Sequence, residues 1–163
     1  MLLSLPRANN CLSSKGKPEL NYPPRFAPLL RSRATLSDPS RVLVTASVAG
    51  IGVGSLGENA TFAYSASKAA ALHLTRNLAV ELGPQGILCN AIAPGFFPTK
   101  MANGLMELEG GTKRLAEETP NRRLGRAEDV AAAVVFLSSR AGSHVNGDFV
   151  VLDGGSVLAK GKL

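Results

Sequence analysis

The sequence contains few of the residues that build metal centres and disulfide frameworks. Its 163 residues include two cysteines, Cys11 and Cys89, and two histidines, His73 and His144. These positions have no metal-ligand or paired-cysteine spacing, so the sequence predicts no metal site and no disulfide framework. Cys89 lies in the apolar run GILCNAIAP and is expected to be a small buried core residue. Two unpaired cysteines favour a reducing compartment, and we expect the protein to be cytoplasmic.

Long apolar runs are also missing. No stretch reaches the roughly 18 apolar residues that a membrane-spanning helix needs, so no membrane association is predicted. The opening MLLSLPRANN has a short apolar segment that stops at Pro6, a layout that does not match a secretory signal. A mitochondrial leader is the alternative to a cytoplasmic location, because Arg7, Lys15 and Lys17 precede the first acidic residue, Glu19.

The positive charge is unevenly distributed. The net charge of +6 is concentrated in residues 1–41, which carry seven basic and two acidic side chains, whereas residues 42–163 carry eleven basic and ten acidic ones. No basic stripe alternates with aromatic residues, so nucleic-acid binding is not expected.

Residues 1–25 are rich in proline, serine and asparagine and show no period. We therefore predict an unstructured or unrelated N-terminal segment, followed by one domain over residues 26–163.

The domain alternates strand-like and helix-like segments. Short apolar runs predict buried strands at about 41–46, 87–92 and 148–152. Helices are predicted from Phe26 for about three turns, over 62–82, in one or two short pieces within 95–120, and over 126–139. The long helix is expected to end at Gly83-Pro84, with Gly83 in the left-handed conformation. The last helix carries Glu128 and Asp129 in its first turn, where the helix dipole favours acidic residues.

This order predicts the fold class. Strands that are apolar on every residue and separated by helices indicate an α/β fold, in which helices cover both faces of a parallel sheet. In such sheets the ligand site lies at the carboxyl ends of the strands. Ser47 follows the first predicted strand and Pro94-Gly95 follows the second, so both are expected at that edge.

Tyr64 and Lys68 are the strongest candidates for chemistry. They are four residues apart at the start of the long helix, so they share one helix face. A nearby ammonium favours the phenolate form of a tyrosine, and such a pair exchanges protons with an alcohol or carbonyl. The Ser47 hydroxyl could hydrogen-bond the same oxygen. The spacing alone is weak, because a packed tyrosine beside a solvated lysine gives the same pattern.

Five ordered segments strengthen that interpretation. RVLVTASVAG, YSASKAAALHLTRNLAVEL, ILCNAIAPGFFPT, NRRLGRAEDVAAAVVFLSS and VNGDFVVLDGG occur in this order over about residues 26–156. Together they closely resemble the C-terminal half of the short-chain dehydrogenase/reductase family. The resemblance implies a Rossmann-like fold and hydride transfer between NADP or NAD and a small carbonyl or alcohol.

The resemblance also implies roles for individual residues. Tyr64 corresponds to the catalytic acid/base, Lys68 to the lysine that lowers the pKa of that tyrosine and binds the nicotinamide ribose, and Ser47 to the serine that steadies the reacting oxygen. The turn that borders the nicotinamide corresponds to Pro94, Gly95, Phe97 and Thr99. Family members form oligomers, so a homo-oligomer is expected. The 17-residue separation of Ser47 and Tyr64 is similar to a subgroup that includes rhamnolipid-type 3-oxoacyl-carrier-protein reductases.

Other family motifs have no counterpart in this sequence. The phosphate-binding T-G-x-x-x-G-I-G turn does not occur before Ser47, and the GIGVGSLG stretch follows the serine strand, where a phosphate loop does not belong. We therefore expect the N-terminal half of the fold to be missing, through an incomplete gene model, a splice form or a decayed copy. The first strand would then have an open apolar edge. Three hypotheses about the chain remain open. It is an oxidoreductase whose chain alone is inactive, a non-catalytic partner in a relative's oligomer, or a remnant that does not fold.

The segment from Phe96 to Thr119 corresponds to the loop that covers the substrate. Its apolar side chains are Phe96, Phe97, Met101, Leu105 and Met106. They favour an apolar or acyl substrate over a sugar if they face the substrate. The alternative is that they pack onto the core, and the sequence leaves both open.

Overall fold

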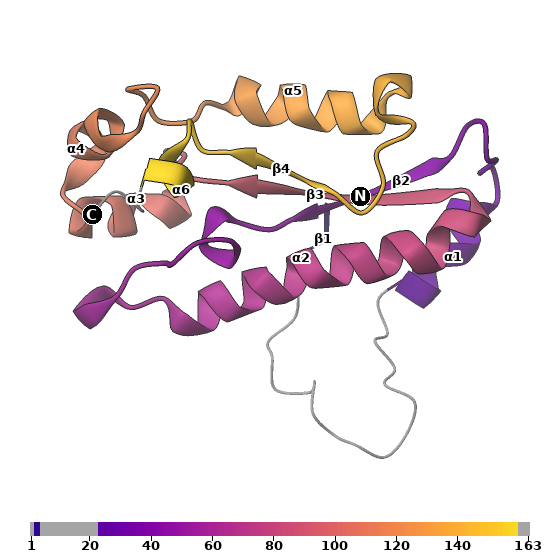
Figure 1. Cartoon of the computed structure of the whole chain (residues 1–163), viewed down its shortest axis with the longest axis horizontal. Helices are drawn as coiled ribbons and strands as arrows, with labels where there is room; N and C mark the ends of the chain where they lie inside the picture. The colour runs from indigo at the N-terminus through magenta and orange to yellow at the C-terminus, as the bar shows by residue number, and fades with distance from the viewer. Residues whose placement is uncertain (1, 4–22, 160–163) are drawn as a thin grey trace, which may run out of the picture.

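The chain forms a parallel sheet between two layers of helices. The computed structural model describes residues 2–3 and 23–159 (Figure 1). The sheet order is β1-β2-β3-β4 and every neighbouring pair is parallel. The strands are β1 (Leu2–Leu3), β2 (Ser40–Thr45), β3 (Ile87–Pro94) and β4 (Phe149–Leu152). The three predicted strands and the α/β class with a Rossmann-like parallel sheet are therefore confirmed.

Helices cover both faces of this sheet. They are α1 (Pro23–Arg31), α2 (Phe62–Leu82), α3 (Lys100–Leu108), α4 (Gly111–Glu118), α5 (Ala127–Ser138) and α6 (Ser156–Ala159). Figure 1 shows α2 along one side of the strands and α5 along the other. The predicted bounds of α2 are confirmed, and α5 lies within the predicted range. The first helix begins at Pro23 rather than Phe26, because proline is well tolerated in the first turn of a helix.

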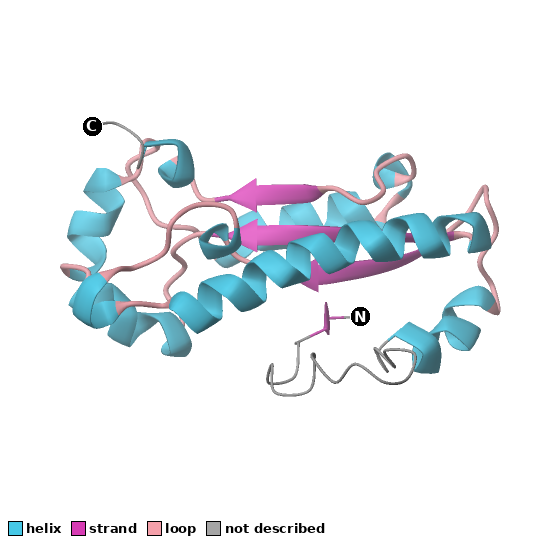
Figure 2. Cartoon of the chain, turned by 60° about the horizontal axis from the view of Figure 1, so that its bottom comes forward, coloured by secondary structure: helices cyan, strands magenta, loops and turns pink. Residues whose placement is uncertain are grey.

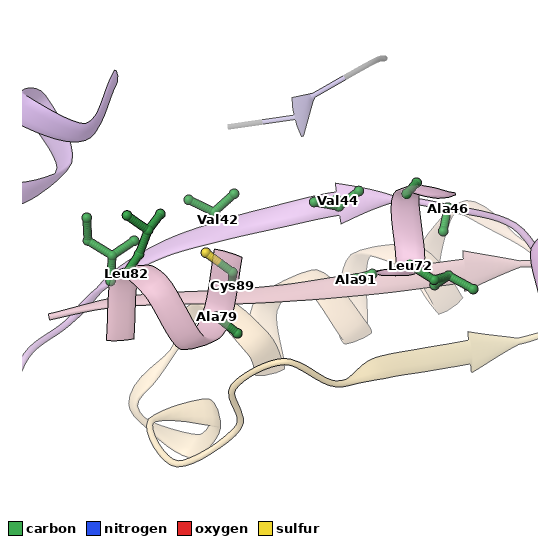
Figure 3. Close-up of a cluster of buried hydrophobic side chains, with 10 residues drawn as sticks. Val42, Val44, Ala46, Leu72, Ala79, Leu82, Cys89 and Ala91 are labelled. Carbon is green, nitrogen blue, oxygen red and sulfur yellow. The ribbon is translucent and has the colours of Figure 1, made fainter. Parts of the chain in front are cut away.

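Side chains that alternate along the strands form a core on each face. Val42 and Val44 of β2 face α2, together with Cys89 of β3 (Figure 3). Leu43, between the two valines, packs in the opposite cluster with Leu137 of α5. Both faces of the sheet are therefore apolar and covered, which explains why the strands lack a polar alternation.

Cys89 is fully buried in the first of these clusters, as predicted. Burial raises the pKa of its thiol to about 11, because the charged thiolate loses its hydration in the core. The residue therefore stays neutral and acts as a small apolar side chain.

The end of α2 differs from the prediction. Gly83 has φ −52°, in the right-handed helical region, and begins a 3-10 turn, Gly83–Gln85. The left-handed residue is Gly86, with φ 73°. Pro84 fits the first turn of this short 3-10 helix, so the chain continues for one more turn before it reverses. A Cβ on Gly86 would also lie 3.1 Å from the carbonyl oxygen of Thr35.

The sequence predicts an open outer edge for β2, but the structure covers part of that edge. The two residues of β1 pair with it, Leu2 opposite Leu43 and Leu3 opposite Val44. Part of the predicted unstructured segment, residues 1–25, is therefore strand or helix. Residues 4–22, which include Cys11, lie outside the described residues.

The carboxyl ends of the strands meet the loops and short helices at one end of the molecule. Figure 2 shows the arrowheads of the strands pointing to the same end, and Figure 1 places α3, α4, α6 and the start of α2 there. This end contains Ser47, Tyr64 and the turn after Pro94, as the topology predicts.

Candidate active site

Ser47 is held at the end of β2 by its own turn. It caps a 3-10 turn, Val48–Gly50, and its Oγ accepts a hydrogen bond of 3.2 Å from the backbone N–H of Ala49. The same hydroxyl donates to the carbonyl oxygen of Pro94 at 3.4 Å. The residue is 8% exposed. Ser47 therefore links the end of β2 to the end of β3.

Tyr64 and Lys68 lie one turn apart near the start of α2. The Nζ of Lys68 is 5.5 Å from the centroid of the Tyr64 ring, within range of a cation–π contact. The same Nζ donates a hydrogen bond of 3.0 Å to the carbonyl oxygen of Thr45. Tyr64 is 42% exposed, so its phenol is accessible. Lys68 is thus fixed to the strand that leads into Ser47, and the Tyr64 ring lies beside it.

The turn after β3 packs closely against the end of β4. The N–H of Gly95 donates to the carbonyl oxygen of Leu152 at 2.9 Å. A Cβ at Gly95 would lie 2.7 Å from the Cβ of Asp153, so the close approach requires glycine. Thr99 caps α3, because its Oγ1 accepts from the N–H of Ala102 at 3.2 Å. Pro94, Gly95 and Thr99 therefore form a braced turn at the same edge as Ser47.

Phe97 has a different setting from the rest of this turn. Its ring packs directly over Gly125, where any side chain would collide with it. The ring also lines a cavity of about 190 Å³ whose walls include Arg123, Asp129 and Asp153. Phe97 is thus anchored on the segment that precedes α5.

An ion pair fixes that segment. Arg123 donates to both carboxylate oxygens of Asp129 at 2.6 and 2.9 Å, and the N–H of Arg126 donates to Asp129 at 2.8 Å. The bond from Arg123, reinforced by that from Arg126, lowers the pKa of Asp129 to about 2. The prediction that Glu128 and Asp129 lie in the first helical turn is confirmed.

The apolar residues of the segment from Phe96 to Thr119 divide between the two alternatives. Met106 is fully buried, so it packs on the core. Phe97 is partly buried against Gly125, and Phe96 and Leu105 are also partly buried. The side chain of Met101 lies outside what the structure describes. Core packing therefore accounts for Met106 and for much of Phe97, and the apolar composition of this segment is weak support for an apolar substrate.

Two contacts at the site could not have been found from sequence patterns. Ser55, in the loop after β2, donates to Oε1 of Glu109 at 2.7 Å, across 54 positions in the chain. Lys68 reaches Thr45 across 23 positions. Neither pair has a periodic spacing, so only the folded chain places them together.

In residues 2–3 and 23–159, no group of three or more histidine, cysteine or acidic side chains is placed to hold a metal ion. Among the helices that the structure describes, none is long and apolar enough to cross a membrane.

The site therefore combines a hydroxyl, a phenol and an ammonium at the carboxyl end of a parallel sheet. These groups can donate or accept protons and hydrogen bonds at a substrate oxygen. They contain no redox centre, so an oxidation or reduction needs a bound cofactor.

Comparison with known proteins gives a consistent family match. The family model described as "Enoyl-(Acyl carrier protein) reductase" matches residues 26–157. The short-chain dehydrogenase/reductase VdtF of Byssochlamys spectabilis is 40% identical over 121 residues, covering 74% of this chain and 38% of that protein. The rhamnolipids biosynthesis 3-oxoacyl-[acyl-carrier-protein] reductase of Pseudomonas aeruginosa is 40% identical over 131 residues, covering 80% of this chain and 50% of that protein. The expected similarity to the rhamnolipid-type reductase is confirmed.

Solved structures agree with this match. The Pseudomonas aeruginosa RhlG/NADP active-site complex superposes with a TM-score of 0.73 at 36% identity, covering 82% of this chain and 53% of that one. A gluconate 5-dehydrogenase from Burkholderia cenocepacia, in complex with NADP and tartrate, has a TM-score of 0.70 at 27% identity, covering 83% and 50%. The chain spans about half the length of these relatives.

Proposed function

Because this chain belongs to the short-chain dehydrogenase/reductase family, we propose that its site transfers hydride between NADP or NAD and a carbonyl or alcohol. The observation that carries the proposal is the pairing of Tyr64 with Lys68 beside the end of β2. The Nζ of Lys68 lies near the phenol ring and is fixed by Thr45, so its positive charge stays close to the group that would exchange the proton.

The proton step follows from these positions. In the reducing direction, the Tyr64 hydroxyl gives its proton to the substrate oxygen as the carbonyl carbon is reduced, and the Lys68 ammonium stabilises the phenolate that remains. The Ser47 hydroxyl has a single proton, so it must turn away from the Pro94 carbonyl, its 3.4 Å acceptor, to donate a hydrogen bond to the same oxygen and stabilise the negative charge that develops there. In the oxidising direction the proton returns to the phenolate.

The residues present fit one end of the cofactor. Ser47 binds the carbonyl of Pro94, which keeps the Pro94–Thr99 turn beside the catalytic serine. We propose that Pro94, Gly95, Phe97 and Thr99 border the nicotinamide, with Lys68 holding its ribose. A bound nicotinamide would supply or accept the hydride.

The pyrophosphate end has no counterpart among these residues. Two of the glycines after Ser47 are used in packing: Gly50 rests on the backbone of Lys68, and Gly54 approaches Ser65 and Thr61 of the α2 region. Gly50 and Gly54 are therefore not free to surround a phosphate. We expect this chain to bind the dinucleotide weakly, and solved relatives with bound NADP favour NADP as the first cofactor to test.

The substrate class is proposed from the names of the relatives. These include enzymes named for 3-oxoacyl-carrier-protein, for 5-keto-D-gluconate and for a 7alpha-hydroxysteroid. Each of these named substrates reacts at a ketone or a secondary alcohol. We therefore propose a small carbonyl or alcohol substrate, and an acyl or other apolar substrate as the narrower option.

The test is an assay of NADPH oxidation by the purified chain at millimolar NADPH, with 5-keto-D-gluconate and a short 3-oxoacyl thioester as substrates. The chain alone is expected to be inactive at ordinary NADPH concentrations because it binds the dinucleotide weakly; at millimolar NADPH we expect turnover that Tyr64→Phe lowers by about 100-fold or more, the usual range for loss of a general acid. Tyr22→Phe is the matched control, because Tyr22 is the other tyrosine of the chain. Equal rates for wild type and Tyr64→Phe would refute the role of Tyr64, and no turnover by the wild type would refute catalysis by this chain.

A second candidate is a non-catalytic partner in an oligomer. Phe62 and Val80 are both largely exposed on α2 and, being five turns apart, lie on one stripe of the helix. Val135 and Phe136 are exposed on α5. We propose that a subunit contact covers these exposed apolar side chains. If this candidate is correct, sizing chromatography of the chain mixed with the Pseudomonas reductase will give a mixed species that Phe62→Asp abolishes; separate peaks for the wild type would count against it.

A further inference from the structure

We propose that Gly50 is a positioning residue of this site, because its missing side chain lets the turn after Ser47 rest on the backbone of α2 at Lys68. The catalytic part of this inference rests on the proposed function, whereas the structural part does not. Gly50 lies outside the proposed catalytic and cofactor-binding residues, and its role follows from what surrounds it.

The contact is between two backbones. A Cβ placed on Gly50 would lie 2.5 Å from the carbonyl carbon of Lys68, 2.6 Å from the nitrogen of Ala69 and 2.8 Å from the carbonyl oxygen of Lys68. These atoms belong to the middle of a hydrogen-bonded helix, so they cannot move aside individually. Any larger residue at this position must lift the whole turn away from α2.

The neighbouring Gly52 behaves differently. Its Cβ would lie 2.8 Å from Cγ2 of Val157, the end of a side chain that can rotate away. Gly104, on α3, would meet nothing within 4 Å. Gly52 and Gly104 therefore lack the backbone restriction that applies to Gly50.

The turn carries this restriction directly to Ser47. The N–H of Gly50 donates to the carbonyl oxygen of Ser47 at 3.0 Å, and the N–H of Ala49 donates to the hydroxyl of Ser47 at 3.2 Å. A displacement of Gly50 thus moves both the backbone and the side chain of Ser47.

Lys68 holds the chain on both sides of Ser47. Its backbone lies under Gly50, three residues after the serine, and its Nζ binds the carbonyl of Thr45, two residues before it. The distance between α2 and the end of β2 therefore decides whether the ammonium reaches Thr45 and where it lies beside Tyr64. An added methyl group at Gly50 would increase that distance by about 1 Å, a misplacement that can cost about 100-fold in rate.

The experiment compares Gly50→Ala with Gly104→Ala in chains labelled with ¹³C,¹⁵N-lysine. The Lys68 side-chain resonance is assigned as the one that disappears in Lys68→Arg. Its chemical shift should differ from those of exposed lysines because of the Tyr64 ring and the hydrogen bond to Thr45. We expect Gly50→Ala to move this resonance toward those of the exposed lysines, while Gly104→Ala leaves it unchanged. A loss of stability alone would not shift it at temperatures well below unfolding. An unchanged Lys68 resonance in folded Gly50→Ala would overturn the proposal.

Two further measurements keep the test decisive. If Gly50→Ala does not fold, the wild-type chain must still show a nuclear Overhauser effect between the α protons of Gly50 and the amide proton of Ala69; its absence would overturn the proposal. In the NADPH assay, Gly50→Ala should lower kcat about 100-fold, whereas Val135→Ala, an exposed change on α5 outside the proposed site, should not. A chain without any turnover would refute the proposed catalysis and leave the resonance test of positioning intact, so the two failures are distinguishable.

Discussion

Replacing Leu137 with alanine should destabilise the protein more than any other single change in α5. Leu137 is fully buried, and it packs in the cluster formed with Leu43 and Ile92 beneath the helix. The other buried residue of α5 is Ala133, which has little side chain to contribute. Leu137 is therefore the large fully buried side chain of α5, beside the partly buried Val130 and Val134, and its removal leaves a cavity that the neighbouring strands cannot close.

We expect the free energy of unfolding to fall by about 3 kcal/mol, within the range for buried Leu→Ala changes. With a typical urea dependence of about 2 kcal/mol per molar, the urea midpoint followed by circular dichroism should fall by about 1.5 M. Val135→Ala on the same helix is the matched control, because Val135 is 66% exposed and should change the free energy of unfolding by no more than about 0.5 kcal/mol. A loss below about 1 kcal/mol for Leu137→Ala, or equal losses for both variants, would refute the assignment of α5 to the second face of the sheet.

Further predictions concern charge, burial and backbone conformation. The depressed pKa of Asp129 means that its carboxylate stabilises the fold above about pH 4 and that this contribution is lost as pH falls toward 2, so acid unfolding of wild type and Asp129→Asn should converge near pH 2. Because the folded state keeps the Cys89 thiol protonated, stability should fall as pH rises from about 9 to 11, and mass spectrometry should find Cys89 unmodified by iodoacetamide at pH 8 unless urea is present. Gly86→Ala should lower the free energy of unfolding by about 1–2 kcal/mol in urea titrations because of its positive φ, whereas Gly104→Ala in open space should raise it by about 0.5–1 kcal/mol. Equal effects of the two glycine substitutions would contradict this reasoning.

Local patterns in the sequence predicted the elements well. The range of α2 and the buried state of Cys89 follow from apolar periodicity and from an unbroken apolar strand, both of which depend on neighbouring residues. The end of α2 was harder, since Gly83, Pro84 and Gly86 all favour termination. Which glycine takes the left-handed conformation depends on the approach of Thr35, from a distant part of the chain.

The candidate site could be only partly predicted. The choice of Ser47, Tyr64 and Lys68 came from an ordered set of motifs, and their roles stay predictions. The hydrogen bond between Lys68 and Thr45 depends on the distance between a helix and a strand end, which no local pattern encodes. The requirement for glycine at position 50 also depends on the packing of α2 against that residue, which no local pattern encodes.

The unequal lengths of the strand pairings have a consequence for how firmly each part of the site is held. β3 shares six residue pairs with β2 and four with β4, whereas β1 shares two with β2. Amide protons of β3 should therefore exchange with solvent last, and those at the outer edge first. The turn at Pro94 continues directly from this slowest-exchanging strand, so it would remain in place while the edges of the sheet open and close.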